Sequence, residues 1–245
     1  MTDTPNLVLR YFAARGRAQF LRYYFRIRDI PFVDEEVELS ADFAAWTAIR
    51  GDRTKSGPFQ KLPVLHCEGQ QIAETPVIAT FVHEHFGDAR SLSASENLQH
   101  AMLASCLYVD VMMPIGMLIW ADLAFVGVDV SAAAKRTLER MNAHLHNIER
   151  TLIEWQWFAR ADKRPTTVAD CLLWDQLMTA TQVFGKHLKL SDHETLSGFF
   201  GEFPARAQCL KMLQTHPCQI TGLPGEPEAL AAIRDGLDRA EQSAN

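Results

Sequence analysis

Two neighbouring stretches decide how the rest of the chain folds: KLPVL at residues 61–65 and ETPVI at residues 74–78. Pro63 donates no backbone hydrogen bond, so it must stand at the start of a strand, on an edge or at a bulge. Its preceding peptide bond is a candidate for the cis form, which is nearly exclusive to bonds before proline. Gly69 predicts a hairpin between the two stretches. The second stretch then opens a helix, whose first-turn amides would hold a carboxylate or a phosphate.

The flanking residues predict a small α/β unit. Residues 7–12 read as a first strand, a helix runs to about Arg28, and a second strand begins near Ile30, before an acidic run. Residues 51–58 are rich in Gly, Ser and Lys and predict a loop. The resulting order of strands and helices needs a crossover between the first two strands. Taken alone, each part also fits an ordinary edge strand and a capped helix.

The composition changes after this unit. Residues from about 87 to 95 are small and polar, which predicts a linker. The remaining sequence is helical in character, so we expect an α/β domain at residues 1–87 and an all-α domain at residues 94–245. Helix starts are expected at Ser93 or Ser95, Ser131, Thr167, Ser191 and Glu202, with a tail helix from about Glu226 to Ala240.

Composition excludes several classes of protein. Apolar residues make up 47% of the 245 residues, charged residues 22%, and the net charge is -6, so no basic field suggests a nucleic-acid partner. Residues 1–5 show no signal peptide. The five cysteines are scattered and never spaced C-x-x-C, which argues against a disulfide framework, a zinc site and a dithiol motif. A cytoplasmic location is therefore expected.

The apolar stretch from Leu98 to Ala121 is long enough to raise the possibility of a membrane span. His100, Asp110 and Pro114 lie inside it, and no Lys or Arg flanks it closely. We therefore expect a buried helix that is bent near Pro114 and no membrane partner.

Several motifs resemble one known family. Residues 7–22, LVLRYFAARGRAQFLR, resemble the opening of the tyrosine-type cytosolic glutathione transferases (sigma, alpha, mu and pi kinds), with Gln19 in place of the usual acid. FQKLP at residues 59–63 resembles the family's aromatic-x-Gln-hydrophobic-Pro segment, with Lys in place of Gln. TVAD at residues 167–170 is a capping box that resembles that of the family's buried helix. Glu74-Thr75, Phe203-Pro204 and His216-Pro217 fall where the family often has similar motifs. The resemblance implies a thioredoxin-like N-terminal domain followed by a helical domain that carries the wall of the electrophile site.

The resemblance also implies a catalytic pair. Tyr11 occupies the position of the family's catalytic tyrosine, and Arg15 lies where some members place an arginine near the sulfur. A hydroxyl donor and a cation near a thiol stabilise the thiolate, and a free thiol has a pKa of about 8.5. Glutathione would thus be a co-substrate, and no metal is expected. From the residues alone, Tyr11 also fits a core aromatic and Arg15 a surface charge.

Four residues would anchor the middle and the γ-glutamyl end of glutathione. The backbone of Leu62, before Pro63, would pair with the cysteinyl amide. Glu74 suits the ammonium group, and Thr75 with the helix amides suits the carboxylate.

Three residues would face the glycine carboxylate. Trp46 and Arg50 have the spacing of the sigma-type Trp and Lys, and arginine can bind a carboxylate with two hydrogen bonds. Lys61 would lie nearby, although it fits an exposed strand-end lysine equally well.

Function therefore has three readings. The first is conjugation of glutathione to small apolar electrophiles, the second a glutathione-dependent isomerase or peroxidase on the same site, and the third a non-catalytic interaction module, because fold does not fix function. Phe59 falls where alpha- and pi-type members insert an aromatic side chain into the partner subunit, so a homodimer is expected. The sequence does not identify the electrophile.

Overall fold

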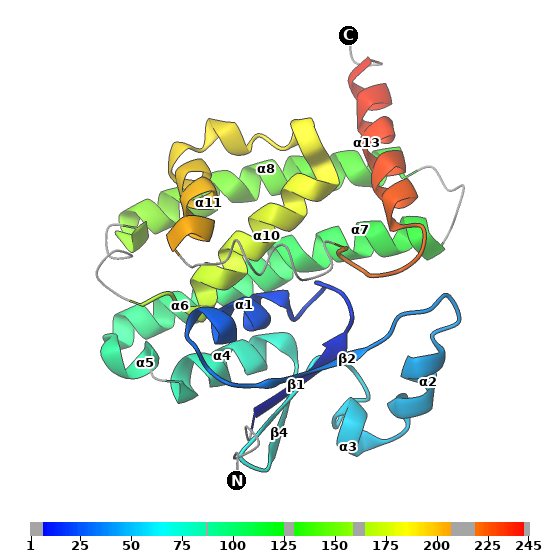
Figure 1. Ribbon diagram of the computed structural model, residues 1–245. Helices are drawn as coiled ribbons and strands as arrows, with labels where there is room; N and C mark the ends of the chain where they lie inside the picture. The colour runs from blue at the N-terminus through cyan, green and yellow to red at the C-terminus, as the bar shows by residue number, and fades with distance from the viewer. Residues whose placement is uncertain (1–6, 87, 125–129, 159–164, 207–218, 243–245) are drawn as a thin grey trace. The chain divides into compact units, whose positions relative to one another are not determined.

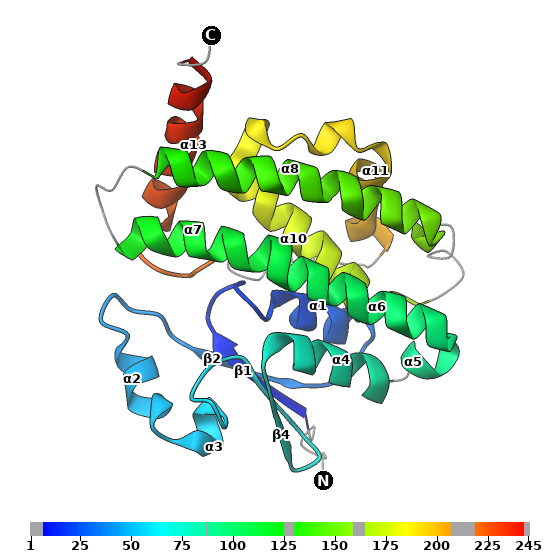
Figure 2. The same ribbon diagram turned by 180° about the vertical axis from the view of Figure 1, so that it is seen from behind.

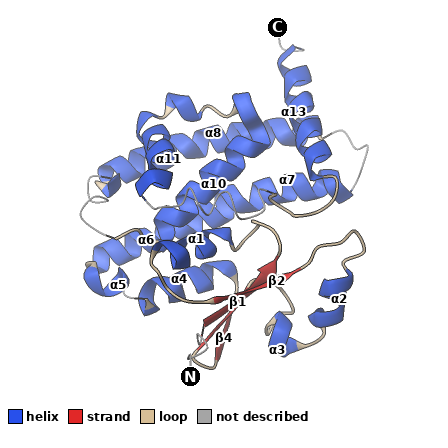
Figure 3. Cartoon of the chain, in the orientation of Figure 1, coloured by secondary structure: helices blue, strands red, loops and turns tan. Residues whose placement is uncertain are grey.

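The computed structural model describes residues 7–86, 88–124, 130–158, 165–206 and 219–242, which divide into two compact units. The first unit consists of Met1–Ala104, Thr166–Leu172 and Ala207–Pro224, and the second of Ser105–Pro165, Leu173–Arg206 and Gly225–Asn245. The fold class is confirmed, because a small mixed sheet with helices is followed by a mostly helical region (Figure 3). The division at residues 87 and 94 stays a prediction.

The first unit is built on a four-stranded sheet. Its strands are β1 (Leu7–Phe12), β2 (Val33–Val37), β3 (Val64–Cys67) and β4 (Gln70–Ala73), in the order β2-β1-β3-β4. β1 runs parallel to β2, which requires the crossover through α1, and the other pairs are antiparallel. The expected strand, hairpin and crossover are therefore all present.

Helices flank this sheet (Figures 1 and 2). They are α1 (Gln19–Ile27), α2 (Ala44–Arg50), α3 (Arg53–Ser56), α4 (Thr75–His85), α5 (Asp88–Ser91) and α6 (Ala94–Cys106). α1 and α4 lie side by side next to the sheet, apart from α2 and α3. Two expectations were too simple, because the predicted loop at 51–58 contains α3 and the predicted linker contains α5. Asp52 caps α3 by accepting a hydrogen bond from the Thr54 amide at 3.0 Å, which explains the extra turn.

The acidic run after residue 33 lies inside β2, whereas the sequence predicted it to follow the strand. Carboxylates disfavour strands unless a partner compensates them. Here Arg22 reaches both Asp34 and Glu36 from α1, at 3.0 and 3.4 Å. A partner distant in sequence therefore makes the acidic strand possible.

The expected helix start at Ser93 and the expected capping box at Thr167 are confirmed, and Ser93 also forms a capping box. The Ser93 amide donates to Glu96 at 2.8 Å while the Ser93 hydroxyl accepts from the Glu96 amide at 3.2 Å. The Thr167 amide donates to Asp170 at 2.9 Å, and the Asp170 amide donates back to the Thr167 hydroxyl at 3.3 Å. These reciprocal bonds satisfy the first amides of α6 and of α10 (Val168–Phe184).

The predicted apolar helix is present but is less buried than expected. α6 continues through a π-helical segment (Leu107–Met112) into α7 (Met113–Ala124). The π-helical segment ends just before Pro114, which cannot donate to the carbonyl four residues earlier. Ala94–Trp120 is one helix in the described chain that is long and apolar enough to cross a membrane, and 39% of its most apolar window is buried. The helices of water-soluble proteins pass the same test, so the finding alone is weak evidence for a membrane span.

The second unit is helical. Its elements include α7, α8 (Ser131–Glu154), most of α10, the short helices η2 (Gly185–His187) and η3 (Leu190–Asp192), α11 (Glu194–Arg206) and α13 (Glu226–Gln242). The tail helix is confirmed, but no helix starts at Glu202, because Pro204 lies inside α11. Pro204 has no N–H to donate to the Phe200 carbonyl. That carbonyl instead accepts the indole N–H of the buried Trp174 at 3.1 Å.

Candidate functional site

Strand register brings three predicted site positions to one end of the sheet. Arg10 pairs with Val64, and Val64 pairs with Ala73, so these three residues form one row across β1, β3 and β4. Tyr11, Pro63 and Glu74 each stand one residue beyond that row, on the same side of it. Because neighbouring strands are about 4.8 Å apart, the backbones of all three positions lie within about 10 Å.

Tyr11 is held against the loop that follows β1. Its side chain is 6% exposed, and its hydroxyl oxygen accepts the Arg17 amide at 2.9 Å. Gly16 has φ +38, and a Cβ at this position would lie on the Tyr11 hydroxyl oxygen. Glycine is therefore required here both for the backbone conformation and for the space under the tyrosine.

Arg22 ties both ends of this loop and is a residue that the sequence reasoning missed. Arginine side chains are mostly exposed in proteins, whereas Arg22 is fully buried. Its guanidinium donates to the carbonyls of Phe12 at 3.1 Å and Ala14 at 2.7 Å, and lies 5.9 Å from the centre of the Tyr11 ring. The helical pattern of α1 gave no signal for this role, because the carboxylate partners lie in β2.

A segment from far along the chain covers the same loop within the first unit. The amides of Arg15 and Gly16 donate to the carbonyls of Gln219 and Ile220 at 3.1 and 2.8 Å. Gly222 follows at φ +71, and an added Cβ would approach the Ala13 carbonyl to 2.9 Å. Arg15 itself is buried, at 3% exposure, so its predicted alternative as a surface charge is wrong.

The Leu62–Pro63 peptide bond is cis, as the sequence suggested. Leu62 is 8% exposed, and neither its amide nor its carbonyl has a hydrogen-bond partner among the described residues. Buried backbone groups are nearly always paired in native proteins. An extended ligand could therefore supply both missing hydrogen bonds.

Glu74 and Thr75 stand at the N-terminus of α4. Glu74 has φ 69, an uncommon and costly conformation for a residue with a side chain, and such strain is enriched at ligand sites. Thr75 is 3% exposed and precedes Pro76 in the first turn. The helix start offers amide donors and the positive end of the helix dipole to an anion.

The remaining predicted residues are linked to the same end of the sheet. The half-buried Trp46 ring packs edge-on against Phe12, with ring centres 5.6 Å apart. Arg50 and Lys61 are exposed, and both contact the buried Ser56: its hydroxyl donates to the Arg50 carbonyl at 2.8 Å, and its carbonyl accepts the Lys61 amide at 2.8 Å. Both contacts are made by backbone groups of Arg50 and Lys61, so Ser56 fixes the backbone positions of two residues whose side chains are exposed cations.

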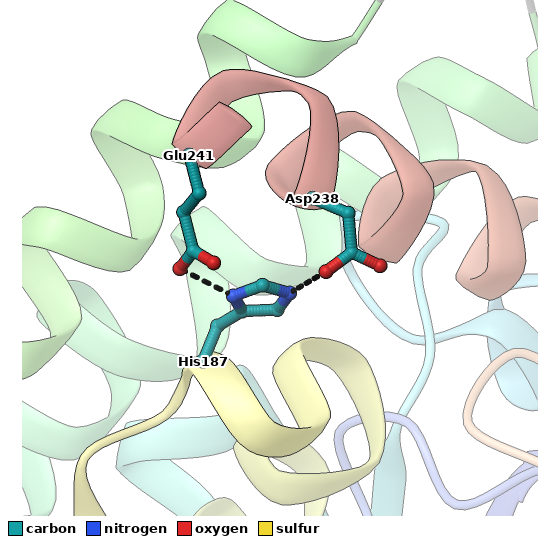
Figure 4. A group of neighbouring side chains, drawn as sticks. All are labelled: His187, Asp238 and Glu241. Atoms are coloured by element: carbon teal, nitrogen blue, oxygen red, sulfur yellow. Dashed lines mark hydrogen bonds and ion pairs between the residues drawn. The ribbon is translucent and has the colours of Figure 1, made fainter. Parts of the chain in front are cut away.

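A separate group in the second unit has residue types that bind metals (Figure 4). His187 Nδ1 lies 2.8 Å from Glu241, and its Nε2 lies 3.2 Å from Asp238. Lys186 donates to the same Asp238 oxygen at 2.6 Å. Because each imidazole nitrogen already faces a carboxylate and Lys186 supplies positive charge, a metal ion would have to displace these contacts. The group therefore fits an ion-pair network between η2 and α13.

Comparisons with known proteins agree with the architecture. No family model matches the chain. Mouse hematopoietic prostaglandin D synthase is 38% identical over 78 residues, 32% of this chain and 35% of that protein. Glutathione S-transferase 4 of Caenorhabditis elegans is 28% identical over 92 residues, 38% of this chain and 41% of that protein. The matches to these two curated relatives thus span less than half of the length of either.

The solved structures show the fold over nearly the whole chain. The monomeric glutathione S-transferase Na-GST-3 of the hookworm Necator americanus superimposes with a TM-score of 0.70, covers 86% of this chain and 98% of its own, and is 19% identical. At that identity the superposition establishes architecture alone. The predicted thioredoxin-like domain with a helical region is confirmed.

Proposed function

We propose that this chain, a member of the cytosolic glutathione transferase family, binds glutathione at the end of its sheet and activates the thiol for attack on small apolar electrophiles. The observation that carries the proposal is the row that places Tyr11, Pro63 and Glu74 together, with the unpaired backbone of Leu62 beside them. A site for this tripeptide needs a hydrogen-bond donor for the thiolate, a backbone segment to pair with the peptide and a helix start to bind a carboxylate.

Tyr11 is the proposed activating residue. The Arg17 amide donates to its hydroxyl oxygen, and a hydroxyl that accepts one hydrogen bond donates another more strongly. The Tyr11 proton directed at sulfur stabilises the thiolate, with Arg15 as the proposed neighbouring cation. A one-unit fall of the thiol pKa from about 8.5 corresponds to about 1.4 kcal/mol of preference for the anion.

The proposed anchors extend along the tripeptide. Leu62 accepts and donates the two backbone hydrogen bonds of the cysteinyl residue, and its present lack of partners supports this role. Glu74 binds the γ-glutamyl ammonium, and Thr75 with the α4 amides binds the neighbouring carboxylate. The strained backbone at Glu74 supports a ligand role, because strained residues cluster at ligand-binding sites.

Trp46, Arg50 and Lys61 are proposed to bind the glycine carboxylate. The shared contact of Arg50 and Lys61 with Ser56 supports their acting together. Arg50 can form a two-bonded pair with the carboxylate, whereas Lys61 acts as a point charge.

Isomerisation is the second candidate, because one relative is named a prostaglandin D synthase. The same thiolate serves conjugation, isomerisation and peroxide reduction, so the thiol measurement below does not distinguish them. A non-catalytic interaction module is distinguished by that measurement, since it has no need of an activated thiol.

A homodimer in the cytoplasm is also proposed. Phe59 is 62% exposed, and Val77, Leu98 and Met102 of the same unit are large apolar side chains that are more than half exposed. The described cysteines Cys67, Cys106 and Cys171 are thiols, which suits a reducing compartment. Sedimentation should give a dimer at micromolar concentration, and Phe59→Ser should shift it towards monomer, whereas a wild-type monomer would contradict the proposal.

The decisive experiment is the ultraviolet difference spectrum of bound glutathione as pH is varied, which reports the thiolate. The wild-type thiol should titrate at least about one unit below 8.5, and Tyr11→Phe should move the pKa back towards that value. Tyr23→Phe, at a buried tyrosine of α1, is the matched control and should leave the thiol pKa unchanged.

The possible results separate the readings. A lowered pKa that depends on Tyr11 supports an enzyme of the transferase or isomerase kind. Glutathione binding with an unchanged thiol pKa would leave a binding module, and no binding would overturn the proposal and leave the fold alone.

A further inference from the structure

A cavity of about 190 Å³ lies within the first unit, apart from the residues of the proposed glutathione site. α4 and α6 supply most of its lining, and the start of α10 supplies the rest. Its polar lining includes His83, Asn97 and His100, and its apolar lining consists largely of alanine side chains with Val168. The cavity is therefore mostly apolar with a few polar groups, the usual composition of a small-molecule site.

Two imidazole rings form one part of this lining. His83 is 7% exposed and His100 is 5% exposed, and their rings stack with centres 4.5 Å apart and planes at 21°. Burying two histidines costs free energy, because their ring nitrogens need hydrogen-bond partners. An apolar pair would fill the same space without that cost.

The hydrogen bonds of Asn97 fix the tautomer of His83. The Asn97 amide nitrogen donates to the carbonyls of Ala89 at 3.0 Å and Leu92 at 3.4 Å, so its oxygen faces His83. His83 Nε2 lies 2.7 Å from that oxygen and must carry the hydrogen that it donates. Neutral His83 therefore has its lone pair on Nδ1.

Nδ1 of His83 is buried and has no hydrogen-bond partner in the described chain. A buried acceptor without a donor loses the hydrogen bonds that water gave it, and the loss is removed when a donor arrives. Since His83 itself lines the cavity, an occupant of the cavity can be that donor.

The volume sets the size of the occupant. An engineered apolar cavity of about 150 Å³ accommodates benzene, so about 190 Å³ accommodates one aromatic ring with a small substituent. Stacked imidazoles suit a flat ring, because aromatic rings pack favourably at such distances. Metal binding fits less well, because among the described residues the group of three ligating side chains lies at His187, Asp238 and Glu241 and not at this cavity.

We propose that this cavity is a second ligand site, which binds a single-ring aromatic molecule bearing one O–H donor, a phenol, with that donor bonded to His83 Nδ1. The alanine side chains contact the ring, and the unpaired buried acceptor of His83 favours a ligand that carries a hydroxyl. The proposal does not rest on glutathione chemistry, and its tests are made without glutathione.

The test is a titration of ¹⁵N-labelled protein with phenol, followed through the imidazole nitrogen resonances by NMR. The His83 signals are those absent from His83→Phe. Phenol should move the His83 Nδ1 resonance from the position of a bare acceptor towards that of a hydrogen-bonded one. Toluene, which has the same shape without the donor, should bind about tenfold or more weakly, because one buried acceptor stays unpaired.

Three variants complete the design. His83→Phe should bind phenol and toluene equally, and Ala104→Leu, which fills the cavity, should weaken both about tenfold or more. His85→Phe is the matched control on the same helix, since His85 does not line the cavity, and it should retain the wild-type preference. Thermal melts verify that each variant is folded.

The proposal is overturned if phenol leaves the His83 resonances unchanged at millimolar concentration, in which case the cavity holds water only. It is also overturned if phenol and toluene bind the wild type equally, or if His83→Phe retains the preference for phenol.

Discussion

The chain contains two networks in which one basic side chain is held between two carboxylates, around Arg22 in the first unit and around His187 in the second. Both central side chains are buried, at 0% and 2% exposure. The carboxylates differ: Asp34 and Glu36 are 16% and 37% exposed, whereas Asp238 and Glu241 are 38% and 64% exposed. The contacts in the two networks are alike, but the carboxylates around Arg22 are on average more buried than those around His187.

The two networks differ in whether water can hydrate the partner groups when a contact is lost. Around His187 the exposed carboxylates regain hydration when a contact is lost, so each pair contributes little. Around Arg22 the guanidinium also donates to the backbone carbonyls of Phe12 and Ala14, at the start of the loop that follows Tyr11. A buried ion that loses its partner costs far more than the pair itself contributes.

Arg22→Met is therefore expected to have the largest effect. It removes the buried guanidinium that donates to Asp34 and to the carbonyls of Phe12 and Ala14, and we expect a loss of about 3–5 kcal/mol in the free energy of unfolding. Urea unfolding followed by circular dichroism gives this value. Where the variant stays folded, its glutathione thiol pKa should also rise, because the Tyr11 loop is no longer held.

Arg26→Met is the matched control for Arg22. Arg26 contacts the same Asp34 at 3.4 Å from the same helix, but its side chain is 29% exposed. It should lose less than about 1 kcal/mol. Equal losses for the two variants would mean that the carboxylate contact matters and the loop carbonyls do not.

Glu149→Gln tests an intermediate case in the second unit. Glu149 accepts hydrogen bonds from His193 at 3.0 Å and from the amides of Thr195 and Leu196 at 2.8 and 3.3 Å, at the start of α11. Its side chain is 15% exposed. We expect the free energy of unfolding to fall by about 1–2 kcal/mol at pH 7. This loss is smaller than that for Arg22→Met, because the substitution removes one charge and leaves the Tyr11 loop intact.

The pH dependence of this loss has a definite sign. Burial by itself raises the pKa of Glu149, but the hydrogen bonds from His193, Thr195 and Leu196 outweigh it and leave the pKa below its ordinary value. A lowered folded pKa gives stability that is present above the ordinary glutamate value of about 4.3 and is lost as pH falls through the folded value. The gap between wild type and Glu149→Gln should therefore narrow below about pH 4.

Glu154→Gln is the control on the same helix, since its carboxylate is 65% exposed and pairs with Arg150 at 3.9 Å. It should leave both the stability at pH 7 and its pH dependence near those of wild type. A constant gap for Glu149→Gln from pH 7 to pH 3 would show that the carboxylate charge is not the source of its contribution.

The same contrast explains which parts of the molecule the sequence predicted. The hairpin, the helix start at Ser93 and the capping box at Thr167 were predicted, and the Leu62–Pro63 bond was a candidate for the cis form, because each depends on residues only a few positions apart. The strand register that groups Tyr11 with Glu74 was not predicted, and the two residues were assigned to one site through the family resemblance.

Features set by distant partners were missed. The role of Arg22 was missed because the sequence of α1 alone does not reveal the carboxylates of β2. The amides of the Arg15 loop donate to the carbonyls of Gln219 and Ile220, which lie about 200 residues away. A single sequence carries no signal for such a contact. Pro204 was expected to open a helix because the Trp174 indole that serves the orphaned carbonyl is 30 residues away.

Asp238→Asn is expected to have the smallest effect. A hydrogen bond from Lys186 lowers the pKa of Asp238, with His187 adding to it, so its contribution is present above about pH 4 and is lost as pH falls through the folded value. Exposed pairs of this kind often contribute nothing measurable, and salt screens them. The melting temperatures of wild type and variant should therefore agree within error at pH 7 in high salt. A loss of stability as large as that of Arg22→Met would contradict this expectation. It would mean that the buried imidazole of His187 depends on Asp238, and that the exposure of a carboxylate does not decide its contribution to stability.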